Sequence, residues 1–584
     1  MCGVAGLLDK KNKNDRKKLE VIVKSMLCLM QHRGGDAIGV QTVNSVTMGH
    51  TRLSIVDPTS QADQPFYNTH SVFSFNGEIY NHQKLRRKYL GNAEIFTHSD
   101  TATLFALLER LSIKTVLKAI QGMFAFSYFN ARRNSLILAL DRHAIKPLYY
   151  IDTPDYFAWA SEAKAFGAIP RFTFQFQDKH ISEYMIFRYV AGENTLFKNV
   201  YKLQPGEYLT YSRKNKIFKK QKYYELSNLD KVPLFNEKIL EKSVKDHLMG
   251  DIAAGVQLSG GVDSSIVALL AKKCSKADLH TFSIGLQDSY WNEFDYSDLV
   301  ARKLKTIHHK IIFSKNDFVK LLPKITYHLD EPLVHPNTVP MYLLAKEARK
   351  YTKVLLTGEG ADEVFYGYKR YFNNIKNEAG IILSNAFNDP QTVNKILKDS
   401  HLSPLNRQKM LRFVKKISLD KKVSLYDLQT YLPHVLLRQD KAGMAANIEN
   451  RVPFLHKSVV ESGLNSLSRI GRLGGKNSVK KIALKYFPQE LVLRRKCGFG
   501  LPVSEWLIDP DCLLPQLSKL TAHKVIKKYF SVKETGRLIR EHVDGKNNHS
   551  STLLTLLSLV IWYDVFIGST KGRNLMRNDV KLRH

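Results

Sequence analysis

One change in the pattern of apolar segments, near Asn236, limits the folds that this chain can adopt. The residues before it read mainly as strands and turns with two interposed helices, whereas after it apolar strands alternate with longer helices. Strands that alternate with helices predict a parallel sheet with helices on both of its faces. Because 584 residues exceed the roughly 250–300 that one hydrophobic core holds, we expect a β-rich domain followed by an α/β domain.

The expected elements follow from short apolar runs and from the helical spacing of apolar residues. In the first domain the predicted strands are residues 1–8, 46–56, 72–75, 122–129 and 136–140, and the predicted helices are 19–31 and 100–111. In the second domain the predicted strands are 255–258, 279–284, 310–313 and 354–357, and the predicted helices are 264–273 and 296–304. The last part of the chain is predicted to be mainly helical.

The domain boundary is predicted at residues 202–224, which combine a Pro-Gly pair with many lysines and little periodicity. We therefore expect a first domain at 2–205, a linker at 206–235, a second domain at 236–570 and a basic tail at 571–584. The longest apolar run, 553–568, contains Asp564 and is shorter than the roughly 20 residues of a membrane-spanning helix. It predicts a buried helix.

The chain is strongly basic, with 88 Lys and Arg against 54 Asp and Glu and a net charge of +34. Nucleic acid, an anionic membrane and anionic substrates are the partners that such a charge suggests. The basic residues are spread along the chain without an RNA-binding motif or zinc finger, so we expect no specific nucleic acid and no membrane. Nucleic-acid binding stays open as an alternative, and a steep loss of DNA binding with salt would reveal it.

The cysteines and the N-terminus indicate the compartment. Five widely spaced cysteines, an odd number, predict free thiols in a reducing environment. The apolar stretch at the N-terminus is too short for a signal peptide, and its charges follow it instead of preceding it. We therefore expect a cytoplasmic protein.

Cys2 directly follows the initiator methionine. Removal of Met1 would leave Cys2 with a free α-amine, whose pKa of about 8 lets it accept the thiol proton. Hydrolysis of an amide by such a thiolate also needs oxyanion donors, a cation for the substrate carboxylate and an acid for the substrate ammonium. Asn76 with the amide of Gly77, Arg52 and Asp100 suit these three roles.

Two glycine-containing loops each follow an apolar strand of the second domain. Residues 258–265 (LSGGVDSS) lead into a helix, so their backbone amides can form an anion site and Asp263 could hold Mg²⁺. Residues 357–363 (TGEGADE) carry three carboxylates, Glu359, Asp362 and Glu363, which suit metal binding or general-base work. Because strand ends in a doubly wound sheet face one crevice, we expect the two loops to share a site.

The chain resembles the glutamine-hydrolysing asparagine synthetases over nearly its whole length. The motifs that carry the resemblance lie in order along both halves: MCGVAG, HRGGD, GHTRLSIVD, QPFYNTHSVFSFNGEIYNH, THSDT, GMFAFSYF, DRHAIKPLYY, ASEAKAF, LSGGVDSS, LTGEGADEVFYGY, RVPFL and KCGFGLPVSEWL. The resemblance implies an α+β N-terminal-nucleophile glutaminase, a four-layer sandwich of two antiparallel sheets between helices. An α/β ATP-pyrophosphatase domain with a parallel sheet and a largely helical C-terminal part would follow it.

The resemblance also implies a reaction and residue roles. Ammonia from glutamine would pass through a tunnel to a carboxylate that ATP has adenylated, with Cys2 attacking the glutamine amide. Asn76 and Gly77 would stabilise the oxyanion, Glu359 would serve the amination step, and Lys481 would balance phosphate charge. The implied glutamine-binding residues are Arg52, Leu53, Ser54, Ile55, Val56, Asn76, Gly77, Glu78 and Asp100. The implied ATP-binding residues are Leu258, Ser259, Gly260, Gly261, Asp263, Ser264, Ser265, Ile284, Thr357 and Gly358.

ATP and Mg²⁺ are therefore the expected cofactors, with Asp263 and Asp362 as the implied metal ligands. The expected partners are small molecules, namely glutamine, ATP and aspartate or another carboxylate, and the chain could form a homodimer.

The departures from the patterns of the resembled family include Gly35 for proline in RGPD, Ala102 for glutamate in SDTE, His335 for aspartate in DEPxxDPS, His456 for aspartate in EVRxPFLD and Lys485 for arginine in KxxLR. The last three lie in the second domain, so the ammonia acceptor is the least determined feature. Aspartate is the expected acceptor, and another carboxylate, such as a sugar acid, is the alternative.

Overall fold

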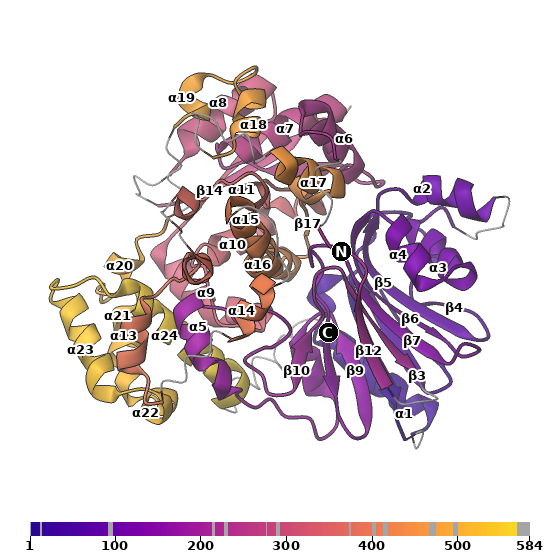
Figure 1. Ribbon diagram of the computed structural model, residues 1–584, viewed down its shortest axis with the longest axis horizontal. Coiled ribbons are helices and arrows are strands. Elements are labelled where there is room, and N and C mark those ends of the chain that lie inside the picture. The colour runs from indigo at the N-terminus through magenta and orange to yellow at the C-terminus, as the bar shows by residue number, and fades with distance from the viewer. Residues whose placement is uncertain are drawn as a thin grey trace.

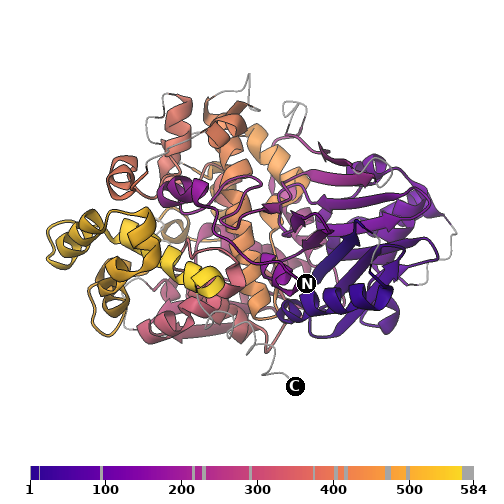
Figure 2. The same cartoon turned by 90° about the horizontal axis from the view of Figure 1, so that it is seen from below.

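The computed structural model describes residues 2–568 except 12–13, 92–96, 213–216, 227–231, 276, 288–291, 373–374, 376, 400–404, 413–418, 467–474 and 495–499. Two antiparallel sheets form one end of the molecule, and a parallel sheet with many helices forms the rest (Figure 1). The view from below shows helices α22 and α23 at the end farthest from the antiparallel sheets (Figure 2). The predicted basic tail, 571–584, lies outside the described residues.

The first half contains two six-stranded antiparallel sheets. The first has the order β10-β8-β9-β1-β3-β2 and the second the order β12-β11-β7-β6-β5-β4. The strands of the first sheet are β1 (Gly3–Asp9), β2 (Ala37–Val43), β3 (Val46–Arg52), β8 (Tyr149–Asp152), β9 (Tyr156–Ala160) and β10 (Val200–Lys202). Those of the second are β4 (Phe66–Tyr67), β5 (Ser71–Ile79), β6 (Gly122–Asn130), β7 (Ser135–Leu140), β11 (Glu207–Ser212) and β12 (Ile217–Lys222).

The alternation of side chains along each strand builds the layers. Val4 and Leu8 of β1 pack into the core between the two sheets, whereas Ala5 and Leu7 belong to the cluster that includes helix α1 (Arg16–Cys28). Helices α3 (Asp100–Arg110) and α4 (Ile113–Ala119) cover the outer face of the second sheet. The four-layer sandwich expected for this half is therefore confirmed.

The predicted linker at 206–235 is wrong over much of its length, because β11 and β12 pair with each other and extend the second sheet from β7. Tyr208, Leu209 and Tyr211 are buried, and the lysines of β12 lie on the outermost strand, where Lys219, Lys220 and Lys222 are exposed. Lysines on an edge strand discourage pairing with a second molecule. With these lysines the strand lacks the alternation of apolar and polar residues that predicts a strand from sequence.

The second half is built on a five-stranded parallel sheet with the order β15-β14-β13-β16-β17, as the alternation of strands and helices predicted. Its strands are β13 (Ala254–Gln257), β14 (His280–Leu286), β15 (Ile307–Phe313), β16 (Val354–Leu356) and β17 (Glu449–Arg451). Helix α10 (Thr338–Ala348) packs on one face against Phe282 and Leu355, and helix α7 (Val262–Cys274) packs from the other side with Val256 and Leu356. From β13 the chain forms β14 and β15 on one side of that strand, and it then forms β16 on the other side. This reversal of strand order creates a crevice at the carboxyl ends of β13 and β16.

Helices fill the remainder of the described chain. They are α2 (His82–Leu85), α5 (Ile181–Phe187), α6 (Glu237–His247), α8 (Phe294–Leu304), α9 (Lys315–Leu329), α11 (Ala361–Val364), α12 (Glu378–Leu383), α13 (Pro390–Ile396), α14 (Leu405–Arg412), α15 (Leu419–Thr430), α16 (Leu432–Ala445), α17 (Lys457–Ser466), α18 (Asn477–Ala483), α19 (Gln489–Val492), α20 (Val503–Trp506), α21 (Leu514–Ser518), α22 (Lys524–Tyr529), α23 (Val532–Val543) and α24 (Ser550–Tyr563). Among the described residues, one segment, Ser550–Gly568, is long and apolar enough to cross a bilayer, but 61% of its most apolar window is buried. The prediction of a buried helix at 553–568 is thus confirmed.

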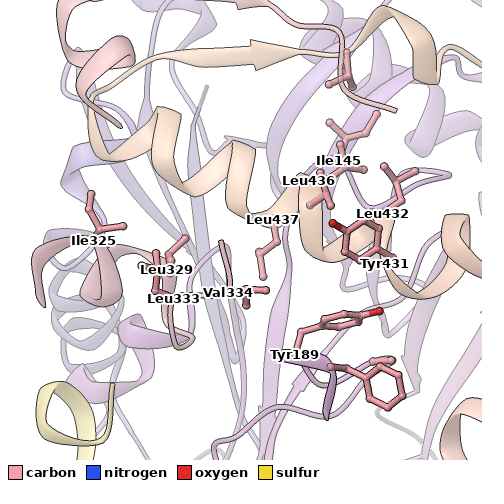
Figure 3. Close-up of a cluster of buried hydrophobic side chains, with 14 of the residues drawn as sticks. Ile145, Tyr189, Ile325, Leu329, Leu333, Val334, Tyr431, Leu432, Leu436 and Leu437 are labelled. Atoms are coloured by element: carbon pink, nitrogen blue, oxygen red, sulfur yellow. The ribbon is translucent and has the colours of Figure 1, made fainter. Parts of the chain in front are cut away.

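The two halves share a buried interface of apolar and charged groups. Figure 3 shows part of the apolar cluster, in which Ile145 of the first half lies beside Leu436 of α16. Arg33 forms buried ion pairs with Glu162 (2.8 Å) and with Asp440 of α16 (2.7 Å). Buried charges are tolerated when they are paired, and this pairing fixes the first half against α16.

Candidate active sites

Cys2 lies at one end of the sandwich, just before β1, and meets the end of β5 in the other sheet. Its backbone N–H donates to Oδ1 of Asn76 at 3.0 Å, although the two residues are 74 positions apart. The Nδ2 group of Asn76 is buried without a hydrogen-bond partner among the described residues. A buried amide N–H₂ that faces no acceptor is suited to bind an anion that forms during a reaction. The structure therefore brings together Cys2 and Asn76, as the sequence predicted.

Gly77 must be glycine at this position. Its φ is +150°, and a Cβ atom there would lie 2.1 Å from the carbonyl oxygen of Met123 on β6. The close approach of β6 excludes any side chain, so the backbone of Gly77 stays open beside Asn76.

The environment of the Cys2 thiol works in two directions. Burial is the largest effect and holds the pKa of the thiol above its ordinary value, although the N-terminal ammonium and a hydrogen bond from the backbone of Leu53 act to lower this pKa. Leu53 and Ile55 follow β3 and pack against Val354 of β16, so this loop also contacts the parallel sheet. Solvent stabilises the charge of this buried thiolate only weakly. Formation of the thiolate therefore depends on the nearby amine.

Arg52 ends β3, and its guanidinium binds the loop that follows. It donates to the carbonyl oxygens of Thr59 (2.8 Å) and Asp57 and pairs with Asp63 (2.5 Å). The structure thus gives Arg52 a role in shaping the predicted glutamine-binding loop 53–56, besides its place near the Cys2 thiol.

Two carboxyl side chains, those of Asp100 and Glu78, lie close to Asn76 and Gly77. Asp100, in the first turn of α3, accepts from the backbone N–H of Ile79 at 2.7 Å, and burial raises its pKa to about 6. Glu78 is buried, and its Oε1 lies 3.2 Å from Nη2 of Arg451 on β17. Burial and the neighbouring Asp100 raise the pKa of Glu78 well above its usual value.

The two departures in the first half are structurally mild. Ser99 still caps α3, because the N–H of Ala102 donates to its hydroxyl at 3.1 Å, and only the reciprocal bond of a capping box is lost. Gly35 has a Cβ position whose nearest neighbour is 3.8 Å away, so the site does not demand glycine.

A cavity of about 500 Å³ lies at the carboxyl ends of β13, β14 and β16. The two predicted loops share it, as expected for the crevice of a parallel sheet. Among the predicted ATP-binding residues, those that line it are Leu258, Ser259, Gly261, Asp263, Ser264, Ile284, Thr357 and Gly358.

Gly260 and Ser265 do not line this cavity. Gly260 has a φ of +71°, and a Cβ atom there would lie 2.7 Å from Tyr296, so its role is to let α8 approach the loop. The hydroxyl of Ser265 donates to the carbonyl oxygen of Gly261 at 2.8 Å and stabilises the first turn of α7.

Lys481, the lysine that the resemblance implied for phosphate, does not line the cavity. Lys481 is exposed, whereas Lys476 and Lys480 line the cavity. Residues four apart share a helix face, and the next residue points about 100° away, so Lys481 on α18 turns outward. Lys485 also lies at the surface, paired with Glu237 at 3.1 Å.

Lys476 joins two predicted metal ligands. Its Nζ lies 2.5 Å from Oδ2 of Asp263 and 2.6 Å from Oδ1 of Asp362. The other carboxylate oxygen of Asp263 is buried without a partner in the described part of the chain. Two carboxylates that converge on one point fit Mg²⁺, which takes one or two protein oxygens and fills its remaining positions with water and phosphate.

The third acid of the second loop does not face the cavity. Glu363 accepts from the Tyr368 hydroxyl at 2.7 Å, and burial raises its pKa to about 8. Glu359 does line the cavity, where Arg438 of α16 donates to it at 3.0 Å and to Asn337 at 2.9 Å. Asn337 is the last residue of the segment compared with DEPxxDPS, whereas no motif pointed to Arg438, although a charged residue within an otherwise buried helix is a signal for a bound or paired group.

His335 and His456 are not among the described residues that line the cavity. The His335 ring packs against Phe387 and Tyr431. His456 lies at the interface between the halves, with Nε2 3.5 Å from Asp246. The departures at His335, His456 and Lys485 therefore do not alter the lining of the cavity, whereas Asn337, which stands where DEPxxDPS has serine, is part of that lining.

The comparison with protein families covers both halves of the chain. Residues 236–564, more than half of the chain, match the family described as asparagine synthase. The chain belongs to the asparagine synthase family. Residues 1–224 match the glutamine amidotransferase domain, a range that includes β11 and β12.

Relatives cover nearly the whole chain. It is 29% identical to asparagine synthetase [glutamine-hydrolyzing] 1 of Bacillus subtilis, over 97% of each protein. It is 30% identical to asparagine synthetase B [glutamine-hydrolyzing] of Escherichia coli, over 87% of this chain and 84% of that one. A maize (Zea mays) asparagine synthetase [glutamine-hydrolyzing] is 29% identical over 86% of this chain and 78% of its own length.

Proposed function

We propose that this protein is a glutamine-hydrolysing asparagine synthetase. It would hydrolyse glutamine at Cys2 and use the ammonia to amidate aspartate that ATP has adenylated, releasing asparagine, glutamate, AMP and pyrophosphate. One observation carries the proposal: the chain contains two sites. In the first, Cys2 lies beside the unpartnered amide nitrogen of Asn76, and the second is a cavity lined by Asp263, Asp362 and Lys476.

At the glutaminase site, the chemistry begins with proton transfer from the Cys2 thiol to the α-amine that removal of Met1 exposes. The thiolate attacks the amide carbon of glutamine, and Asn76 Nδ2 with the Gly77 amide receives the negative charge on oxygen. The α-ammonium returns its proton to the amide nitrogen, which leaves as ammonia, and water then hydrolyses the thioester to glutamate and regenerates the thiol. Arg52 and Asp100 would hold the α-carboxylate and the α-ammonium of glutamine.

At the synthetase site, backbone amides at the start of α7 and the side chains of Lys476 and Lys480 would hold the phosphates of ATP. Asp263 and Asp362 would hold Mg²⁺, which when bound supplies positive charge to the leaving pyrophosphate. Glu359, oriented by Arg438, would take a proton as ammonia attacks the adenylated carboxylate.

Arg438 and Asn337 suit the acceptor as well. Both line the cavity, and the Nε group of Arg438 is buried without a partner in the described residues. A guanidinium with a free donor fits the second carboxylate of aspartate. His335 and His456 lie outside the lining and Asn337 lies within it, so aspartate is the proposed acceptor and another carboxylate, such as a sugar acid, is the alternative to test.

The test is to incubate the enzyme with glutamine, MgATP and a panel of carboxylates and to identify the amidated product by mass. We expect asparagine, with one pyrophosphate per product. Pyrophosphate release that another carboxylate stimulates and aspartate does not would overturn the choice of acceptor. A cytoplasmic location and a homodimer stay predictions, and size-exclusion chromatography with light scattering would test the latter.

A further inference from the structure

Two charged side chains of the synthetase half enter the glutaminase site. Strand β17 carries Glu449 and Arg451, and both side chains are only 1% exposed. Arg451 Nε donates to Glu449 at 2.5 Å, and Arg451 Nη1 donates to the carbonyl oxygens of His247 (2.6 Å) and Met249 (2.5 Å). These bonds fix the guanidinium so that its remaining nitrogen, Nη2, lies 3.2 Å from Oε1 of Glu78.

The backbone of Arg451 belongs to the other site. Its carbonyl oxygen accepts the N–H of Thr357 at 2.9 Å, and Arg451 pairs with Leu356 in the parallel register of β16 and β17. Thr357 begins the loop that lines the nucleotide cavity. One residue thus contacts the nucleotide loop through its backbone and the glutaminase site through its side chain.

Two polar atoms near Cys2, Asn76 Nδ2 and Glu78 Oε2, are buried without a hydrogen-bond partner in the described part of the chain, and Arg451 Nη2 makes only its ion pair with Glu78. Buried polar groups are nearly always partnered in folded proteins, so these open atoms point to a ligand that supplies the partners. Asn76 and Glu78 flank Gly77 on one strand, and the amide of glutamine would reach both.

We propose that Arg451, a residue of the synthetase half, is a positioning residue for glutamine hydrolysis. Its side chain holds Glu78 in place for the bound glutamine, and its backbone connects the glutamine pocket to the Thr357 loop. This inference rests on the proposed function and deepens it. Glu78 would touch the substrate, and Arg451 would act through Glu78.

Electrostatics support the arrangement. Burial, Asp100 and Glu449 raise the pKa of Glu78, whereas Arg451 and the N-terminal ammonium lower it. The same two cationic groups, with Lys146, lower the pKa of Glu449 to about 2. Without Arg451, the carboxyl groups of Glu78, Asp100 and Glu449 would face one another in a buried site and one would take up a proton. Loss of the guanidinium should therefore move the acidic limb of glutaminase activity to higher pH.

The experiment compares glutamate release from glutamine by the full-length wild type, Arg451→Met, Arg451→Lys, Glu78→Gln and the Arg451→Met/Glu78→Gln double variant between pH 5.5 and 8.5. For Arg451→Met we expect a KM for glutamine raised about 10- to 100-fold, the range for losing a charged hydrogen-bond partner, and an acidic limb at higher pH. Arg451→Lys should restore the position of the limb. In the Glu78→Gln background, Arg451→Met should add little, because both changes remove the same contact.

Lys202→Met is the matched control. Lys202 pairs with Glu331 across the same interface at 3.2 Å, away from Cys2, so its loss should change neither the KM nor the pH profile of the glutaminase. Synthesis fed by ammonium salts, measured in parallel, should fall less in Arg451→Met than synthesis fed by glutamine.

The outcomes separate the inference from the function on which it rests. A wild type that releases no glutamate would refute the proposed function itself. An active wild type with an unchanged KM and pH profile in Arg451→Met, or the same changes in Lys202→Met, would overturn the inference. If Arg451→Met does not fold by circular dichroism, the comparison of Arg451→Lys with Glu78→Gln decides, and wild-type KM and pH profiles in both would overturn it.

Discussion

Replacing Lys476 with methionine is the most direct test of the proposed nucleotide site. Methionine keeps the length and apolar stem of the side chain, but it leaves Asp263 and Asp362 without the ammonium that now lies 2.5 and 2.6 Å from them. The three side chains are 6%, 12% and 15% exposed, so these ion pairs are mostly removed from solvent. Loss of one partner from a buried pair costs about 3–5 kcal/mol, and the open side of the cavity places this site near the lower value.

A loss of about 3 kcal/mol should lower the apparent unfolding temperature by roughly 2–4 °C, because the shift for each kcal/mol falls to about 1 °C in a protein of this size. Millimolar Mg²⁺ should raise that temperature more in Lys476→Met than in the wild type, because the metal replaces the missing positive charge between the carboxylates. The KM for ATP in pyrophosphate release should rise about 10- to 100-fold, since a charged hydrogen bond to phosphate is lost.

Lys481→Met is the control for this experiment, because Lys481 lies on α18, the helix that follows Lys476, with its side chain exposed. It should leave both the unfolding temperature and the KM for ATP within experimental error of the wild type. Impaired ATP use in Lys481→Met together with normal use in Lys476→Met would refute the assignment of the lysines.

Three further predictions concern the separate roles of the sites. Cys2→Ala should eliminate glutamine-dependent synthesis and spare synthesis fed by ammonium salts at mildly alkaline pH, and a blocked Met1 removal should give the same result; retained glutamine use would contradict the nucleophile. Asp263→Asn should abolish pyrophosphate release and leave glutamate release measurable, and undiminished pyrophosphate release would count against the metal site. Because burial raises the pKa of Asp100 to about 6, the KM for glutamine should increase as the pH falls through that value, and Asp100→Asn should raise the KM and remove this pH dependence.

Features that depend on neighbours in the sequence could be predicted well. The parallel sheet, helix α3 and the loop at 258–265 each follow from a local pattern of apolar, capping or glycine residues. The two glycine loops that line the cavity could be predicted because glycine beside a strand end has a physical reason that is visible in a few residues. Cys2 stays the predicted nucleophile, and its position after Met1 is the chemical feature on which that prediction rests.

Features that depend on distant partners could not be predicted from the sequence. The three residues of β17 show no strand pattern, because their register is set by β16 and their charges are satisfied by Glu78 and by backbone carbonyls. Strand β12 carries lysines because it is an edge, and only the completed sheet shows which strand is the edge.

The sequence by itself determined the kinds of chemical groups available and the local turns, helices and strands that present them. The tertiary structure decided which of these groups meet: that Lys476 and not Lys481 reaches the carboxylates, and that Arg451 of one half reaches Glu78 of the other. The physical reason is that local backbone preference acts over a few residues, whereas burial brings together charges far apart in the chain and allows them there only when they are paired.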